Sequence, residues 1–209
     1  MNRRLFLAVI GFILTAFTLT SFAQLQETTF NLAAEQKVIT CLSGNDGHSP
    51  LARITVQRGN LNDVLILHAE HLKPNTGFDM FTVQNSNLLS DGTVDPNFKN
   101  FGLAWYQSDV ESDSKGNADV TIKTILLDQI FGFDPVVGLP PTNTFHVGFW
   151  FNNPQDAVAC GFDPTHPTPF NGEHKAGPAA MISVPNVDTG LGPLCTNPEQ
   201  QGQVFVCNP

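Results

Sequence analysis

The chain has 209 residues, with 10 Lys and Arg against 19 Asp and Glu, six His, four Cys and a net charge of −9. Such an acidic surface repels nucleic acids and anionic lipid surfaces, so the composition excludes nucleic acid as a partner. It leaves cations and neutral molecules as candidate ligands.

Residues 1–23 have the features of a removable export signal. Arg3 and Arg4 precede an apolar run over residues 5–19, and Ser21-Phe22-Ala23 supplies the small residues of a cleavage site. The run is shorter than the roughly 20 apolar residues that span a bilayer, so no stable membrane span is expected. The arginine pair followed by Leu-Phe-Leu also resembles the RRxFL twin-arginine signal, which leaves the export route open.

Cleavage after Ala23 predicts a mature chain that works in the periplasm or outside the cell. Eight basic and 19 acidic side chains remain after the cut, so the mature net charge is −11. We expect one domain with three parts. These are a short lead over residues 24–36, a β-sandwich core over 37–151, and a Pro-rich, disulfide-stapled extension over 152–209 that packs on the same domain.

Alternation of apolar and polar residues indicates β-strands through the middle of the chain. Residues 53–57 and 119–123 alternate as half-buried strands do, whereas residues 64–69 are apolar on both faces and predict a central strand. Turn-forming residues at 73–77 separate this strand from the next. Short strands with regular turn signals predict an all-β fold, a single sandwich of immunoglobulin or related Greek-key type.

The last third of the chain has a different composition. Nine of the 15 prolines follow residue 153, and Lys175 is the only basic residue there. Because proline cannot donate a ladder hydrogen bond, long loops are expected, with short strands near residues 180–184 and 204–207.

One local motif resembles a known family. The stretch His71-Leu72-Lys73-Pro74-Asn75-Thr76-Gly77-Phe78 resembles the "gLxPnTxY" corner of fibronectin type III and related extracellular sandwiches. Together with the export signal and the "FHVGFWF" stretch at 145–151, it also resembles secreted bacterial proteins of uncharacterised function. The resemblance implies a sandwich fold and an extracellular compartment, and it implies no activity.

The four cysteines, an even number in an exported chain, predict two disulfides. Cys41 and Cys207 each end an apolar stretch that reads as a terminal strand, and Cys160 and Cys195 flank the Pro-rich segment. We therefore favour the pairs Cys41–Cys207 and Cys160–Cys195. The main alternative is Cys41–Cys160 with Cys195–Cys207.

Histidines are the candidate metal ligands. His146, His166 and His174 come from one predicted strand and two Pro-rich loops, and a copper or zinc site built from them would suit a sandwich that resembles superoxide dismutase. The His-x-His strand pair of such sites is missing. We therefore predict no cofactor and keep a divalent metal as the alternative.

Aromatic and imidazole side chains outside the core stripe are the candidate ligand-binding residues. Trp150 and His146 share one face of a predicted strand, opposite its Phe residues, and Tyr106 faces away from Trp105. An aromatic ring outside the core stacks on a ligand or anchors a partner. The alternative for Trp150 is that the Pro-rich third covers it.

No motif identifies a catalytic site. The chain lacks a GxSxG nucleophile elbow, and its carboxylates are scattered without a pair that stands out as a glycosidase dyad. We expect a non-enzymatic binding or envelope-associated module for an unknown extracellular ligand. The alternative is a metal-binding protein or metal-dependent extracellular enzyme that uses the loop histidines.

Overall fold

The computed structural model describes residues 27–59, 62–124, 132–134, 139–142, 144–195, 199–202 and 204–207. The export signal predicted for residues 1–23 lies outside these ranges and stays a prediction. Within the described ranges, no helix has the length and apolar character that a bilayer crossing requires.

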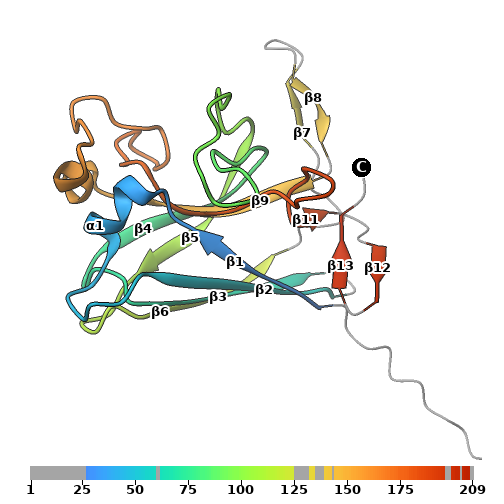
Figure 1. The fold of residues 1–209 in the computed structure, drawn as a ribbon, viewed down its shortest axis with the longest axis horizontal. Coiled ribbons are helices and arrows are strands. Elements are labelled where there is room, and N and C mark those ends of the chain that lie inside the picture. Colours follow the sequence, from blue (N-terminus) through green and yellow to red (C-terminus); the bar gives the residue numbers. More distant parts are fainter. Residues whose placement is uncertain are drawn as a thin grey trace, which may run out of the picture.

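Nine strands of the described chain form one antiparallel sheet (Figure 1). In order along the sheet they are β5 (Ala104–Glu111), β4 (Gly77–Val83), β9 (Thr144–Phe151), β10 (Ala179–Ser183), β1 (Glu27–Ala33), β2 (Leu51–Gln57), β3 (Asp63–Glu70) and β6 (Ala118–Thr124), and β11 (Leu194–Cys195) also pairs with β9. The sheet curls until its end strands, β5 and β6, contact each other. The result is nearly barrel-shaped.

Smaller elements surround this sheet. Two short hairpins join β7 (Gly132–Asp134) to β8 (Leu139–Thr142) and β12 (Glu199–Gln201) to β13 (Val204–Val206). The helical segments are η1 (Gln36–Val38), α1 (Ile39–Leu42) and η2 (Pro154–Cys160). The β7–β8 hairpin lies in the chain between β6 and β9, and the β12–β13 hairpin follows β11.

The prediction of a mostly β chain is confirmed, and the two-sheet sandwich of immunoglobulin type is not. The two halves of the curled sheet, β5-β4-β9 and β3-β6, are joined through β10, β1 and β2 by continuous ladders. Residues 27–33 of the predicted lead form β1, a strand of the sheet. The predicted boundary at residue 152 also separates β10 from the strands that it joins. The polar, half-exposed residues of β1 carry little apolar signal, which is why its pattern reads as a lead.

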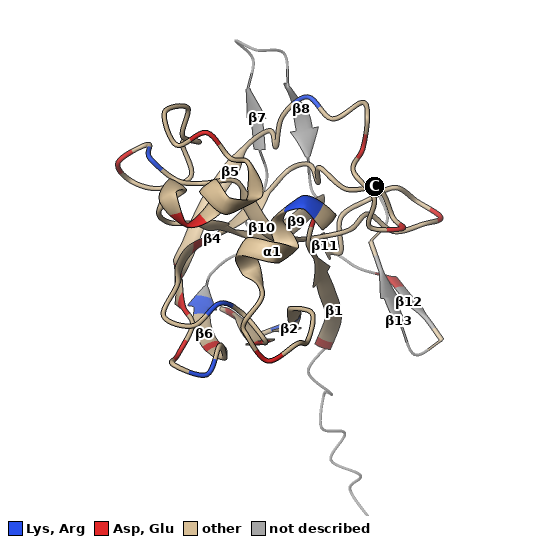
Figure 2. Ribbon diagram, turned by 60° about the vertical axis from the view of Figure 1, so that its left-hand side comes forward, with Lys and Arg blue, Asp and Glu red and all other residues tan. Residues whose placement is uncertain are grey.

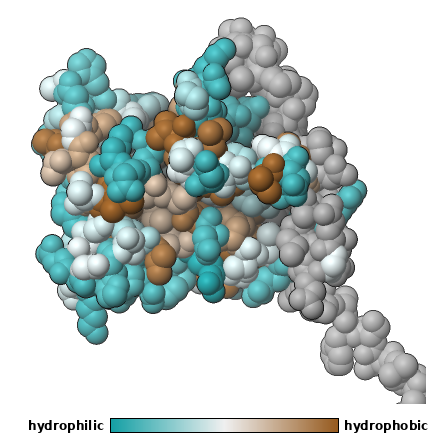
Figure 3. Space-filling view, in the orientation of Figure 1, coloured by the Kyte–Doolittle hydropathy of each residue, from teal (hydrophilic) through white to brown (hydrophobic). Residues whose placement is uncertain are grey.

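The sheet has an apolar cluster on each face. Phe145, Val147, Phe149 and Phe151 point into the inner cluster between the two halves, whereas Trp150 points to the outer one. Every residue of β9 is buried. The loop of residues 84–103 and the Pro-rich segment of residues 152–178 cover its outer face (Figure 1). Apolar residues also reach the surface between the two halves of the sheet (Figure 3).

The disulfides join Cys41 to Cys160 and Cys195 to Cys207, with Cα–Cα distances of 5.8 and 5.7 Å. The favoured prediction of Cys41–Cys207 with Cys160–Cys195 is wrong, and the alternative is the pairing found. The error came from residues 37–41, which were expected to be a strand and instead form η1 and α1. The helical turn of α1 brings Cys41 to η2, where Cys160 lies.

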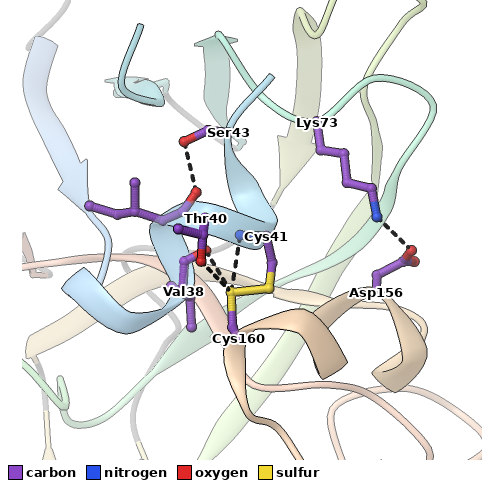
Figure 4. The surroundings of a disulfide bond; sticks show 8 residues. Val38, Thr40, Cys41, Ser43, Lys73, Asp156 and Cys160 are labelled. Carbon is purple, nitrogen blue, oxygen red and sulfur yellow. Dashed lines mark hydrogen bonds and ion pairs between the residues drawn. A yellow bond between two sulfur atoms is a disulfide. The ribbon is translucent and has the colours of Figure 1, made fainter. Parts of the chain in front are cut away.

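The Cys41–Cys160 bridge fastens η2, at the start of the Pro-rich segment, to α1 (Figure 4). The backbone N–H of Cys41 donates to Cys160 Sγ at 3.0 Å. Beside the bridge, Lys73 Nζ donates to Asp156 Oδ1 at 3.2 Å, which links η2 to the loop after β3. The bridge and the ion pair thus hold η2 from two sides.

We predict that the two disulfides contribute unequally to stability. The bridges close loops of sequence separation 119 and 12. In the chain-entropy description, loops of these lengths correspond to roughly 4–5 and about 3 kcal/mol. Urea unfolding should therefore show a larger loss for the Cys41→Ser/Cys160→Ser variant than for Cys195→Ser/Cys207→Ser. Equal losses, or a larger loss from the second pair, would contradict this order, and non-reducing peptide mapping checks the pairing itself.

Candidate functional site

Trp150, one of the predicted ligand-binding residues, lies inside the outer cluster. Its side chain is 0% exposed, and the ring of Phe170 stacks on it with centroids 4.2 Å apart and planes 3° apart. Phe101 and Phe81 meet the same indole edge-on. Trp150 is therefore a core residue and not a stacking surface for a ligand. The alternative for this residue, that the Pro-rich third covers it, is confirmed.

Next to this cluster lies a pocket of about 650 Å³, which we call the carboxylate–tyrosine pocket. Its floor is the outer face of β4 and β5, and its wall is the Pro-rich segment just before and after Phe170. The lining residues are Asp79, Phe81, Tyr106, Asp109, Asn152, Pro169, Asn171, Gly172 and Glu173. The volume is within the range of small-molecule sites in proteins.

Two carboxylates face each other across the floor of the pocket. Asp79 of β4 and Asp109 of β5 are direct cross-strand partners. Like charges in this position destabilise a sheet. Asp79 is only 2% exposed, and burial raises its pKa, with a further contribution from the charge of Asp109. The amide of Asn152 counteracts this by donating to both Asp79 oxygens, at 3.0 and 3.2 Å.

Tyr106, a predicted ligand-binding residue, forms the exposed rim of the same pocket. The ladder between β4 and β5 has an irregularity at Met80 and Phe81, which places Tyr106 and Asp109 on one face although they are three residues apart. The Tyr106 hydroxyl donates to Asp109 Oδ1 at 2.7 Å. Burial and this hydrogen bond raise the pKa of Tyr106 to about 12. The side chain therefore stays a neutral donor, and 51% of it is exposed.

The charge of the pocket is not balanced by its own walls. None of the described lining residues is Lys or Arg, whereas three are Asp or Glu. Lys175 lies beside Glu173 on the exposed surface, with its Nζ 3.7 Å from Glu173 Oε2. Acidic positions also outnumber basic ones over the described fold (Figure 2). The pocket is accordingly a site of negative potential.

His146 lies elsewhere, near the start of β9. Its ring is buried, and its Nδ1 lies 2.9 Å from the carbonyl oxygen of Ser183 on β10. Burial lowers the pKa of His146 to about 4, so the ring is neutral at neutral pH. His146 lines a second pocket and not the carboxylate–tyrosine pocket.

The three histidines of the predicted metal site have separate surroundings. His146 is buried in the sheet, and His166 is exposed and bonds through Nδ1 to Asp163 Oδ2 at 2.8 Å. His174 is exposed in the loop after Phe170, with a φ of 57°. Among the described residues, no group of three His, Cys, Asp or Glu is arranged to hold a metal ion. A divalent metal stays a prediction that metal analysis of the purified protein tests.

Sequence reasoning missed Asp79, Asp109 and Glu173. One signal was available, because Asp79 stands between Phe78 and Met80 in a strand that is otherwise nearly apolar. A lone carboxylate in such a strand indicates a buried charge with a specific environment. Its pairing with Asp109 depends on the ladder register, which the sequence does not reveal.

We predict that His146 makes the protein less stable in mild acid. The folded state holds this imidazole at a pKa of about 4, below the 6.5 of an unfolded chain, so the unfolded state binds the proton more readily. Stability is therefore present above pH 6.5 and is lost as the pH falls towards 4. Between pH 7 and 5 the loss from His146 is about 2 kcal/mol in urea unfolding.

The His146→Phe variant should lose less stability than the wild type over the same pH interval. His68 acts in the opposite direction, because its hydrogen bonds to Asp119 and Glu70 raise its pKa. The His68→Asn variant is therefore the control and should show a steeper loss than the wild type. An unchanged pH dependence in His146→Phe would contradict a buried neutral ring.

The described polar groups of the carboxylate–tyrosine pocket are suited to recognition of positive charge, since acceptors surround an aromatic wall. In comparisons with known proteins, no protein-family model, curated protein or solved structure matched this chain.

Proposed function

We propose that the protein is an exported, non-enzymatic binding protein that holds a small organic cation in the carboxylate–tyrosine pocket. The observation that carries the proposal is the buried Asp79 directly opposite Asp109, in a pocket with no basic residue among its described lining. The predicted export signal and the two disulfides agree with a role outside the cytoplasm.

A bound cation relieves the repulsion that the sheet register imposes. Two carboxylates on adjacent strands repel each other, and burial of Asp79 strengthens every charge interaction nearby because water is excluded. A positive group placed between Asp79, Asp109 and Glu173 interacts favourably with all three. The net charge of the chain adds a long-range attraction for cations and none for anions.

The aromatic wall favours an organic cation over a bare metal ion. The ring of Tyr106 packs edge-on against Phe81 at 5.6 Å, and its hydroxyl is held by Asp109. A fixed, half-exposed ring of this kind attracts an ammonium group over its face, which contributes about 1 kcal/mol. Pro169 and Phe81 add apolar surface for the carbon skeleton of the ligand.

The polar groups of the pocket support binding and not catalysis. Asn152 donates to Asp79, and Tyr106 donates to Asp109, so the nearest donors of the pocket already satisfy the carboxylates. Such bonds fix side chains in position for recognition. Specificity then follows from the position of the charges and the ring.

The test is calorimetric titration of the mature protein at pH 7 with choline and benzylamine. Each probe has a neutral counterpart of the same shape, 3,3-dimethylbutan-1-ol and benzyl alcohol. We expect saturable binding of at least one cation. Its neutral counterpart should bind at least tenfold more weakly, which corresponds to a difference in binding free energy of about 1.4 kcal/mol.

Two variants locate the binding in the pocket. Asp109→Asn removes one charge at constant shape, and Tyr106→Ala removes the ring; each should weaken binding of the cation about tenfold. The matched control is Asp119→Asn, which removes an exposed carboxylate on β6 and should leave affinity unchanged. Equal affinity for cation and neutral counterpart, or equal effects of Asp109→Asn and Asp119→Asn, would refute the proposal.

A further inference from the structure

A second pocket, of about 700 Å³, lies where two loops meet beyond the ends of β4 and β10 and the start of β9. The loops are residues 84–103 and residues 184–193. We call it the His146 pocket, because His146 lines it from the sheet below. It shares no lining residue with the carboxylate–tyrosine pocket.

The hydrogen bonds of His146 fix which nitrogen carries the proton. Nδ1 lies 2.9 Å from the carbonyl oxygen of Ser183, and a carbonyl only accepts, so Nδ1 is the donor. In a neutral imidazole the other nitrogen, Nε2, then has a free lone pair. Among the described residues, no group donates a hydrogen bond to Nε2. The ring is 3% exposed and His146 lines the pocket, so Nε2 is the atom of this side chain that remains for a hydrogen bond with a ligand.

The rest of the lining is polar without a net charge. Amide side chains, which both donate and accept, come from Gln84, Asn85, Asn97, Asn100 and Asn186. The two charged lining residues, Asp95 and Lys99, have opposite signs. Apolar surface is supplied by Leu88, Phe98 and Leu191.

These features select a class of ligand. An acceptor that has no partner among the described residues can receive a hydrogen bond from a ligand that donates one. A neutral ring gives no attraction to an anion, and the balanced charges of the rim give none to either sign. Side chains that both donate and accept match hydroxyl groups, and the apolar patches match the carbon faces of a sugar ring.

We propose that the His146 pocket is a second binding site, which takes a neutral saccharide through a hydroxyl that donates to Nε2 of His146. The site is independent of the proposed cation site, since the two pockets are lined by different residues. Either one can therefore fail without affecting the other.

The test is nuclear magnetic resonance of the mature protein with ¹⁵N-labelled histidine. In the free protein, Nε2 of His146 should show the shift of an unprotonated nitrogen. Titration with glucose, N-acetylglucosamine, maltose and cellobiose should move this resonance saturably for at least one sugar. A protonated Nε2 in the free protein, or no shift with any of the four sugars, would overturn the proposal.

Two variants complete the experiment. His146→Phe removes the acceptor but also a buried hydrogen bond, so Leu191→Trp is used to fill the pocket from its rim while His146 is retained. We expect Leu191→Trp to weaken sugar binding at least tenfold and Asp109→Asn, in the other pocket, to leave it unchanged. Undiminished binding in Leu191→Trp, or a response of His146 to triglycine amide and to no sugar, would refute a saccharide site here.

Discussion

The stacking of Phe170 on Trp150 is the contact on which the outer face of the sheet depends. A strand with large apolar side chains on both faces needs cover on both, and β9 has the Phe residues on one face and Trp150 on the other. Full burial of a large apolar side chain contributes about 1.5–3 kcal/mol, and an aromatic pair adds about 1 kcal/mol. The Pro-rich segment supplies this cover although it has few ladder hydrogen bonds of its own.

The same contact shapes the candidate site. Phe170 stands between Pro169 and Asn171, both of which line the carboxylate–tyrosine pocket, so the stack sets the position of the pocket wall. At the start of the segment, the Cys41–Cys160 bridge and the Lys73–Asp156 ion pair hold η2. Because the segment is fixed at η2 and at Phe170, it covers Asp79, which would be exposed to water on an open sheet face.

Much of the sheet was predictable, because β2 and β6 alternate, β3 contains a continuous apolar run, and turn residues separate the strands. Asn75, in the predicted turn, has the positive φ that such turns use. The failures have physical causes: β1 is mostly polar, and residues 37–41 have an apolar content that suits either a strand or a helical turn. The wrong prediction of the cysteine pairs followed from this second error, because it placed Cys41 at the end of a strand. Asp79 and Asp109 come together through cross-strand register and a ladder irregularity, and neither is encoded by local periodicity.

The most direct test of this account is the fluorescence of Trp150 in a Trp105→Phe background. With Trp150 as the sole indole, we expect short-wavelength emission that acrylamide quenches poorly. Phe170→Ala should shift the emission to longer wavelength and increase quenching, whereas Phe98→Ala, which removes a ring that packs on Phe101, should change neither. An unchanged Trp150 spectrum in Phe170→Ala would contradict the central role of the stack.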